Sequence, residues 1–194
     1  MNKFKELMVK FYKSWLWLII PLLLLDQLTK VWALKAMWNI TLIPNFLHLT
    51  YVRNTGAAWS ILSGNMALLA VISAVVGGAI IGARYYYRTK LNPLKKALFA
   101  VIIAGTFGNF IDRAFYKLLT GTSGVVDFIH FQFGSYHFPI FNVADMCLTL
   151  GIIAFAIVIA LEDIKALKTP KRVEETKVEP KEEAKEEHHE EDNN

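Results

Sequence analysis

Residues 142–161, NVADMCLTLGIIAFAIVIAL, have the composition of a membrane-spanning helix, because they contain no charge after Asp145. A bilayer core about 30 Å thick is crossed by a helix of about 20 mostly apolar residues. Three further stretches have a similar length and composition: residues 15–34, 66–83 and 97–115. We therefore expect an all-α polytopic membrane protein with four transmembrane helices.

The overall composition agrees with this expectation. Of the 194 residues, 54% are hydrophobic and 20% are charged, and the mean hydropathy is +0.34. These values exclude a disordered chain and disfavour an ordinary soluble domain. The single Cys147 excludes an intramolecular disulfide and a multi-cysteine metal site, and we interpret it as a small packing residue.

The first span has an alternative interpretation as part of a signal peptide. Residues 1–36 contain a basic segment and then an apolar block, as secretory signal peptides do, and residues 31–33 loosely resemble a cleavage site. We favour a retained span, because Asp26 and Lys30 would otherwise lie in a discarded segment and three further spans remain.

The cations are distributed unevenly along the chain. Sixteen of the 21 Lys and Arg lie in the N-terminal segment, between the second and third spans, or in the tail. Because cations are retained on the cytoplasmic side, both termini are predicted to be cytoplasmic. We expect no nucleic-acid partner, since no basic patch alternates with aromatic residues on a soluble domain. The tail, residues 164–194, is rich in Lys and Glu without apolar periodicity and is predicted to be disordered.

The two outer loops differ in character. Residues 39–63 contain β-favouring residues with partial alternation and the turn signal Asn54-Thr55-Gly56, which predicts a small extracytoplasmic β-sheet. Residues 120–139 are rich in Gly and aromatic residues, and we expect them to form a second outer loop that rests at the membrane interface.

Acidic side chains are scarce before residue 162, and four aspartates lie in or beside apolar runs, where a carboxylate is costly. Asp127 has apolar neighbours on both sides, and Asp145 begins an apolar helix. If these two carboxyl groups meet, they can share one proton, so that the ionised group activates water and the protonated group polarises a carbonyl. The residues alone leave two alternatives open, namely a proton or ion pathway and a structural polar network.

Two further polar patterns lie in the spans. Asp26, Thr29 and Lys30 share one helix face, so the two charges can pair; the structural alternative is that this ion pair only anchors the helix at the interface. The third span has small and polar residues three or four apart, which suit close helix packing or a site: Gly105, Gly108, Asn109, Asp112 and Arg113. The planar guanidinium of Arg113 can bind main-chain carbonyls or a carboxylate such as Asp112.

Metal ligands are not indicated by the spacing of the histidines. The outer-loop residues His48, His130 and His137 have no HExxH-like arrangement, so we expect no metal site and no cofactor.

Five motifs follow one another on the predicted outer side. They are Asp26-Gln27-Leu28-Thr29-Lys30, Asn54-Thr55-Gly56-Ala57-Ala58, Gly108-Asn109-Phe110-Ile111-Asp112-Arg113, Val125-Val126-Asp127-Phe128 and Phe141-Asn142-Val143-Ala144-Asp145. Together they resemble the lipoprotein signal peptidase family, also called signal peptidase II. The departures are Trp59 in place of an expected Phe, a looser small-residue run at 104–107, and the long charged tail.

The resemblance implies an intramembrane aspartyl endopeptidase of the bacterial cell membrane with its active site near the outer face. Such an enzyme removes the signal peptide from diacylglyceryl-modified prolipoproteins just before the lipidated cysteine. Asp127 and Asp145 would be the catalytic pair. The implied supporting residues are Asp26, Lys30, Asn54, Gly56, Gly108, Asn109, Asp112, Arg113, Asn142 and Ala144. The implied partners are diacylated prolipoproteins and membrane lipids, with a monomeric chain, no cofactor, and residues 1–163 as the peptidase domain.

Overall fold

The structure is a computed structural model that describes residues 2–36, 39–56 and 62–168. Within these ranges, four helices are long and apolar enough to cross a membrane: Leu16–Ala36, Met66–Tyr86, Pro93–Phe115 and Val143–Lys168. The prediction of four membrane-spanning helices is confirmed. The tail was predicted to be disordered from residue 164, but residues 164–168 continue helix α5; the rest of the tail, residues 169–194, lies outside the described residues.

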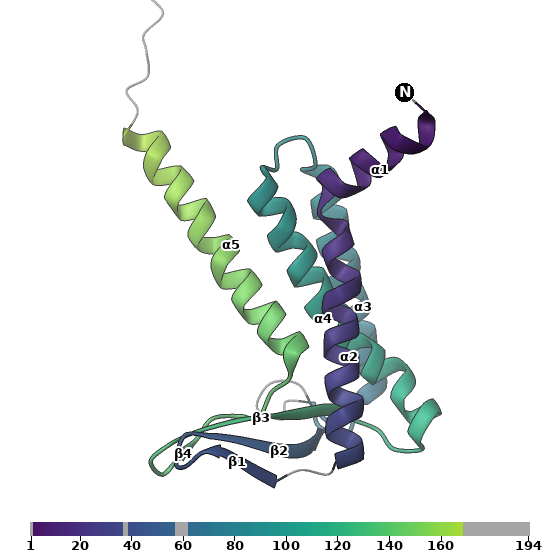
Figure 1. Cartoon of the computed structure of the whole chain (residues 1–194), viewed down its shortest axis with the longest axis vertical. Coiled ribbons are helices and arrows are strands. Elements are labelled where there is room, and N and C mark those ends of the chain that lie inside the picture. The colour runs from purple at the N-terminus through teal and green to yellow at the C-terminus, as the bar shows by residue number, and fades with distance from the viewer. Residues whose placement is uncertain (1, 37–38, 57–61, 169–194) are drawn as a thin grey trace, which may run out of the picture.

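The helical elements are α1 (Lys3–Ser14), the short 3₁₀ helix η1 (Leu16–Leu18), α2 (Ile19–Ala36), α3 (Met66–Tyr86), α4 (Pro93–Thr120) and α5 (Val143–Lys168). Helix α1 was not predicted from the sequence. Trp15 ends α1 in the left-handed conformation, with φ of 61°, so the chain changes direction before α2. Figure 1 shows α1 leaving the bundle at the end opposite the sheet.

Four strands form one antiparallel sheet at the other end of the bundle (Figure 1). They are β1 (Asn39–Ile43), β2 (Leu47–Asn54), β3 (Val125–Phe133) and β4 (Tyr136–His137), in the order β1-β2-β3-β4. The small sheet predicted from the first outer loop is therefore present.

The second outer loop requires a correction, because much of residues 120–139 belongs to this sheet. Strand β3 pairs with β2, with Val52 opposite Asp127 and Asn54 opposite Val125. Residues 125–128 are buried, and strand pairing gives their backbone N–H and C=O groups partners that burial would otherwise deny them.

Small residues allow the helices to meet closely beside the sheet. A Cβ atom on Gly105 would lie 2.5 Å from the Ala144 carbonyl oxygen, and one on Gly108 would lie 2.7 Å from Oδ2 of Asp26. Glycine at these positions therefore lets α2 and α5 approach α4, as the sequence pattern predicted. Away from the sheet, α5 diverges from the other helices (Figure 1).

A backbone bridge joins the sheet to the start of α5. The N–H groups of Phe128 and Ile129 donate to the Phe141 carbonyl at 3.1 and 2.8 Å, and the Phe141 N–H donates to the Ile129 carbonyl at 3.1 Å. This pairing holds the residue that precedes Asn142 against β3. It thereby brings the first turn of α5 to the strand that contains Asp127.

Candidate active site

Amide side chains from three parts of the chain hold two carboxyl groups at the junction of β3 and α5. Asp127, only 2% exposed, accepts hydrogen bonds from the side-chain amides of Asn54 at 3.0 Å and Asn142 at 2.6 Å. Asp145 accepts one from the Asn109 amide at 2.6 Å. The structure thus brings together residues from β2, β3, α4 and α5 that are far apart in the sequence.

Asn142 connects the two carboxyl groups. Its Nδ2 donates to Oδ1 of Asp127 and, at 3.1 Å, to Oδ1 of Asn109. Its Oδ1 accepts from the Asp145 backbone N–H at 2.9 Å, and its own N–H donates to the Asp145 carboxylate at 3.1 Å. This reciprocal pair is a helix-capping arrangement that fixes Asp145 relative to Asn142. Asn142 is fully buried, so one ordered side chain positions both acids.

Asn54 is oriented in turn by Gly56, whose backbone N–H donates to Oδ1 of Asn54 at 3.0 Å. Since the Asn54 oxygen is occupied in this way, its amide N–H₂ faces Asp127. Gly56 therefore acts on the acid through Asn54, and the remainder of its motif, from Ala57 onwards, lies outside the described residues.

Burial and the nearby charge of Asp145 raise the pKa of Asp127 to about 7, against the opposing effect of hydrogen bonds from Asn54 and Asn142. At neutral pH this carboxyl group is therefore poised between its protonated and ionised forms. Acids with such strongly shifted pKa values are concentrated at functional sites.

A buried charge network supports the site from α2 and α4. Nζ of Lys30 lies 2.8 Å from Oδ2 of Asp26 and 3.1 Å from Oδ2 of Asp112, and it donates to Oδ1 of Asn109 at 3.0 Å. The pairing of Asp26 with Lys30 is confirmed. The alternative of an interfacial anchor is wrong, because the Lys30 side chain is fully buried inside the protein.

The same network reaches α5 through Asp26, whose Oδ1 accepts the Ala144 backbone N–H at 2.8 Å. Gly108 leaves the space for this contact, since a Cβ atom there would lie 2.8 Å from the Cβ of Ala144. Thr29 does not join the network, because its hydroxyl donates to the backbone carbonyls of Leu25 and Asp26.

Gln27 is a network member to which sequence reasoning gave no role. Its Nε2 lies within 3.2 Å of acceptors on Asp26, Asp112 and the Gly108 carbonyl. Its place beside Asp26 in a quoted motif was the available signal. Its partners on α4 are 81 and 85 residues away in the sequence, so spacing along α2 could not identify them.

Arg113 contacts a different partner from the suggested Asp112. Its Nη1 donates to the Ser73 hydroxyl on α3 at 2.9 Å, whereas Asp112 is bound by Lys30 and Gln27 and accepts the Val126 N–H at 3.4 Å. Nε of Arg113 is buried without a hydrogen-bond partner. The guanidinium thus retains an unused donor beside the site.

A cavity of about 650 Å³ opens beside the two acids. Its polar lining includes Asn54, Asn109, Arg113, Asp127 and Asp145, and its apolar lining includes Ile72, Val76, Ile140, Leu148 and Leu150. A largely apolar cavity with a few convergent polar groups is typical of a ligand or substrate site. Chemically, the arrangement can place an apolar chain beside a proton-sharing acid pair.

The three outer-loop histidines lie elsewhere on the sheet, with ring centroids 5.5 Å apart for His48 and His130 and 5.1 Å apart for His130 and His137. Within the described ranges, no group of three or more His, Cys, Asp or Glu is arranged to hold a metal ion.

Comparison with known proteins connects this geometry to one family. The family model described as signal peptidase (SPase) II matches residues 18–161. A lipoprotein signal peptidase of Clostridium acetobutylicum is 42% identical over 147 residues, covering 74% of this chain and 91% of that protein. One from Staphylococcus carnosus is 42% identical over 154 residues, covering 78% and 92%.

Solved structures agree with these sequence matches. A bacterial membrane enzyme solved at 2.3 Å resolution by the in meso method has a TM-score of 0.65 and 36% identity, covering 82% of this chain and 94% of its own. A second, solved at 1.9 Å, has a TM-score of 0.60 and 37% identity, covering 76% and 92%. The sequence resemblance is therefore confirmed over the region that contains all five motifs, and the chain belongs to the signal peptidase II family.

Proposed function

We propose that this chain is a membrane-embedded aspartyl endopeptidase that removes the signal peptide from diacylglyceryl-modified prolipoproteins, cutting just before the lipidated cysteine. Its relatives named lipoprotein signal peptidase support the coarser part of this proposal, a protease acting on lipoprotein precursors. The observation that carries the finer part is the pair Asp127 and Asp145, both bound to Asn142 beside the cavity.

The acid pair supplies a complete hydrolytic cycle. With one shared proton, the ionised carboxylate accepts a proton from water while the water oxygen bonds to the scissile carbonyl carbon. The protonated carboxyl group donates its proton to the carbonyl oxygen, which gives a tetrahedral diol. Collapse of the diol breaks the C–N bond and transfers a proton to the leaving amine. The two groups titrate as a unit during this cycle.

The surroundings of the acids suit the proposed substrate. The apolar side of the cavity, which includes Ile72, Val76 and Leu148, can receive an acyl chain or the apolar segment of a signal peptide. Arg113, with its unused Nε–H, can bind a substrate main-chain carbonyl. A substrate held by the membrane can reach this cavity laterally. In our proposal the cavity lies near the outer face of the membrane, both chain termini lie on the cytoplasmic side, and the chain is a monomer.

The proposal is tested with the purified full chain in detergent and a diacylated lipobox peptide, with and without a chelator. We expect cleavage immediately before the lipidated cysteine. Asp127→Asn and Asp145→Asn should each abolish nearly all cleavage in a folded protein, because Asn retains the shape of Asp but cannot exchange a proton. Asp163→Asn is the matched control, since Asp163 is an exposed aspartate on α5, and it should cleave normally.

Three outcomes would contradict the proposal. Near wild-type turnover by either Asn variant would remove that acid from the reaction. Loss of cleavage on chelation would indicate a metal-dependent mechanism. A folded wild-type chain that leaves the diacylated peptide intact would favour a proton pathway or a structural role for the buried acids.

A further inference from the structure

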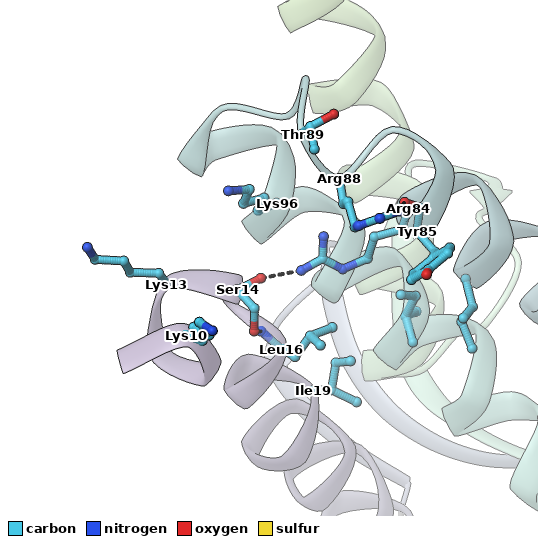
Figure 2. A pocket seen from close by; sticks show the side chains of 12 residues that line it. Lys10, Lys13, Ser14, Leu16, Ile19, Arg84, Tyr85, Arg88, Thr89 and Lys96 are labelled. Atoms are coloured by element: carbon cyan, nitrogen blue, oxygen red, sulfur yellow. Dashed lines mark hydrogen bonds between the residues drawn. The ribbon is translucent and has the colours of Figure 1, made fainter. Parts of the chain in front are cut away.

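A second cavity, of about 720 Å³, lies at the end of the bundle opposite the sheet. It is formed by α1, η1 and the start of α2 together with the end of α3 and part of α4 (Figure 2). Among the residues that the structure describes, five cationic side chains and no acidic one line it: Lys10, Lys13, Arg84, Arg88 and Lys96. The proposed peptidase reaction uses none of these residues.

The cavity has an apolar lining as well as a cationic one. Leu16, Ile19, Ile81 and Ile103 contribute aliphatic side chains from four helical elements. A ligand that fills it therefore needs both negative charge and hydrocarbon. A free inorganic anion would leave the aliphatic lining without a partner.

Arg84 is built into this site, since its side chain is buried with 8% relative exposure near the end of α3. One terminal nitrogen donates to the Ser14 carbonyl at the end of α1, and Figure 2 shows the second terminal nitrogen pointing away from that bond. The helix-end carbonyl accounts for one donor of the guanidinium. Arg84 thus caps α1 and lines the same cavity as the other four cations.

The arrangement of the neighbouring cations favours an anion between them. Arg88 lines the same cavity from the turn that follows α3, where its guanidinium lies 4.2 Å from the centroid of the Tyr85 ring and its Nη1 donates to the Tyr85 carbonyl at 3.0 Å. The cavity thus gathers like charges, which is electrostatically unfavourable. Lys96 lies near the N-terminus of α4, whose first turn contains no acid, and an N-terminus already carries a partial positive charge. An anion would offset both unfavourable terms.

We propose that this cavity binds an anionic phospholipid of the membrane leaflet at this end of the bundle. Its phosphate would lie among Arg84, Arg88 and Lys96, and its acyl chains would lie along the aliphatic lining. Basic pockets between transmembrane helices are suited to lipid headgroups. Helix α1, which exposes Phe4 and Leu7 along with its lysines, has the composition of a helix that lies in the membrane interface beside such a lipid.

Native mass spectrometry of the delipidated full chain in detergent tests the proposal, with phosphatidylglycerol and phosphatidylcholine as probes. We expect one phosphatidylglycerol to bind at least about fivefold more tightly than phosphatidylcholine. A fivefold ratio corresponds to about 1 kcal/mol, which is the contribution expected of a single cation. The double variant Arg88→Gln and Lys96→Gln should lose this preference. The control Lys5→Gln and Lys90→Gln removes the same charge from exposed lysines outside the cavity and should retain it.

Each alternative gives a different result. Equal affinity for the two lipids, or an equal loss of preference in both double variants, would overturn the proposal. The second result would mean that the positive charge of the whole surface, and not this cavity, attracts the anionic lipid. Displacement of phosphatidylglycerol by equimolar glycerol phosphate would indicate a site for a soluble phosphate instead of a lipid. Because the measurement is lipid binding, its outcome is independent of whether the chain cleaves prolipoproteins.

Discussion

Replacing Lys30 with Met should destabilise the protein and slow its reaction. Met retains the length of the aliphatic stem but removes the ammonium that lies 2.8 Å from Asp26 and 3.1 Å from Asp112. All three side chains are at most 2% exposed, so water cannot replace the lost cation. The substitution therefore leaves two buried carboxylates without their shared counter-ion.

The expected loss of stability is large. Removing one partner of a buried ion pair costs about 3–5 kcal/mol, and for a chain of about 150–250 residues each kcal/mol lowers Tm by about 2–4 °C. Lys30→Met should therefore lower Tm by about 6–20 °C. Adding Asp112→Asn should recover part of this loss, because it removes one of the stranded charges and the two sites are coupled.

Cleavage should fall along with stability. Lys30 donates to Oδ1 of Asn109, as Asn142 also does, and the Lys30 bond helps to turn the Asn109 amide toward Asp145. Without it we expect kcat to fall by about tenfold to a hundredfold, as misplacement of a catalytic group by about 1 Å would cause.

The assay combines thermal unfolding in detergent with cleavage of the diacylated peptide well below Tm. Lys35→Met is the matched control, since Lys35 is exposed on the same helix and its loss should change stability by less than about 0.5 kcal/mol. A Tm for Lys30→Met within about 2 °C of the control, which corresponds to at most about 1 kcal/mol, together with an undiminished kcat, would contradict this prediction.

Two further predictions concern groups that face the cavity. Because the pKa of Asp127 is about 7, the shared proton is lost as pH rises through that value, and cleavage should decline on the alkaline side. Asn54→Ala removes a hydrogen bond that favours the ionised form of Asp127, so this decline should move to higher pH. A pH–rate profile in which the alkaline decline stays in place or moves to lower pH would contradict the assignment. Arg113→Lys should reduce cleavage about tenfold or more, because Lys cannot reproduce a guanidinium that binds Ser73 and keeps a second donor free. Exposed Lys117, changed to Arg, is the control, and equal rates in the two variants would remove Arg113 from the site.

Four spanning helices could be predicted from sequence because a transmembrane helix is a local object. Its backbone hydrogen bonds lie within the segment, so length and apolar composition suffice to identify it. The order of five short motifs was enough to identify the family, since each motif can be read from its own residues without knowledge of the segments that connect the motifs. The membrane orientation inferred from the cations stays a prediction.

The sheet shows where local patterns become insufficient. The aromatic residues in 120–139 suit both an interfacial loop and a strand. The outcome depended on pairing with β2, which lies more than 70 residues earlier in the chain. Strand pairing is non-local, and composition does not report which edge is available.

In the site as well, some features could be predicted from the sequence and others could not. Sequence alone determined which carboxylates are costly in a membrane, and that Asp26 and Lys30 share a helix face. Three features became visible only in the folded protein: Asp127 and Asp145 both bind Asn142, Lys30 also reaches Asp112, and the acids face an apolar cavity. Periodicity specifies the side of a helix on which a residue lies, but not the partner that the residue meets inside the protein. That partner depends on how closely glycines allow the helices to approach, and on the backbone bridge between β3 and the start of α5.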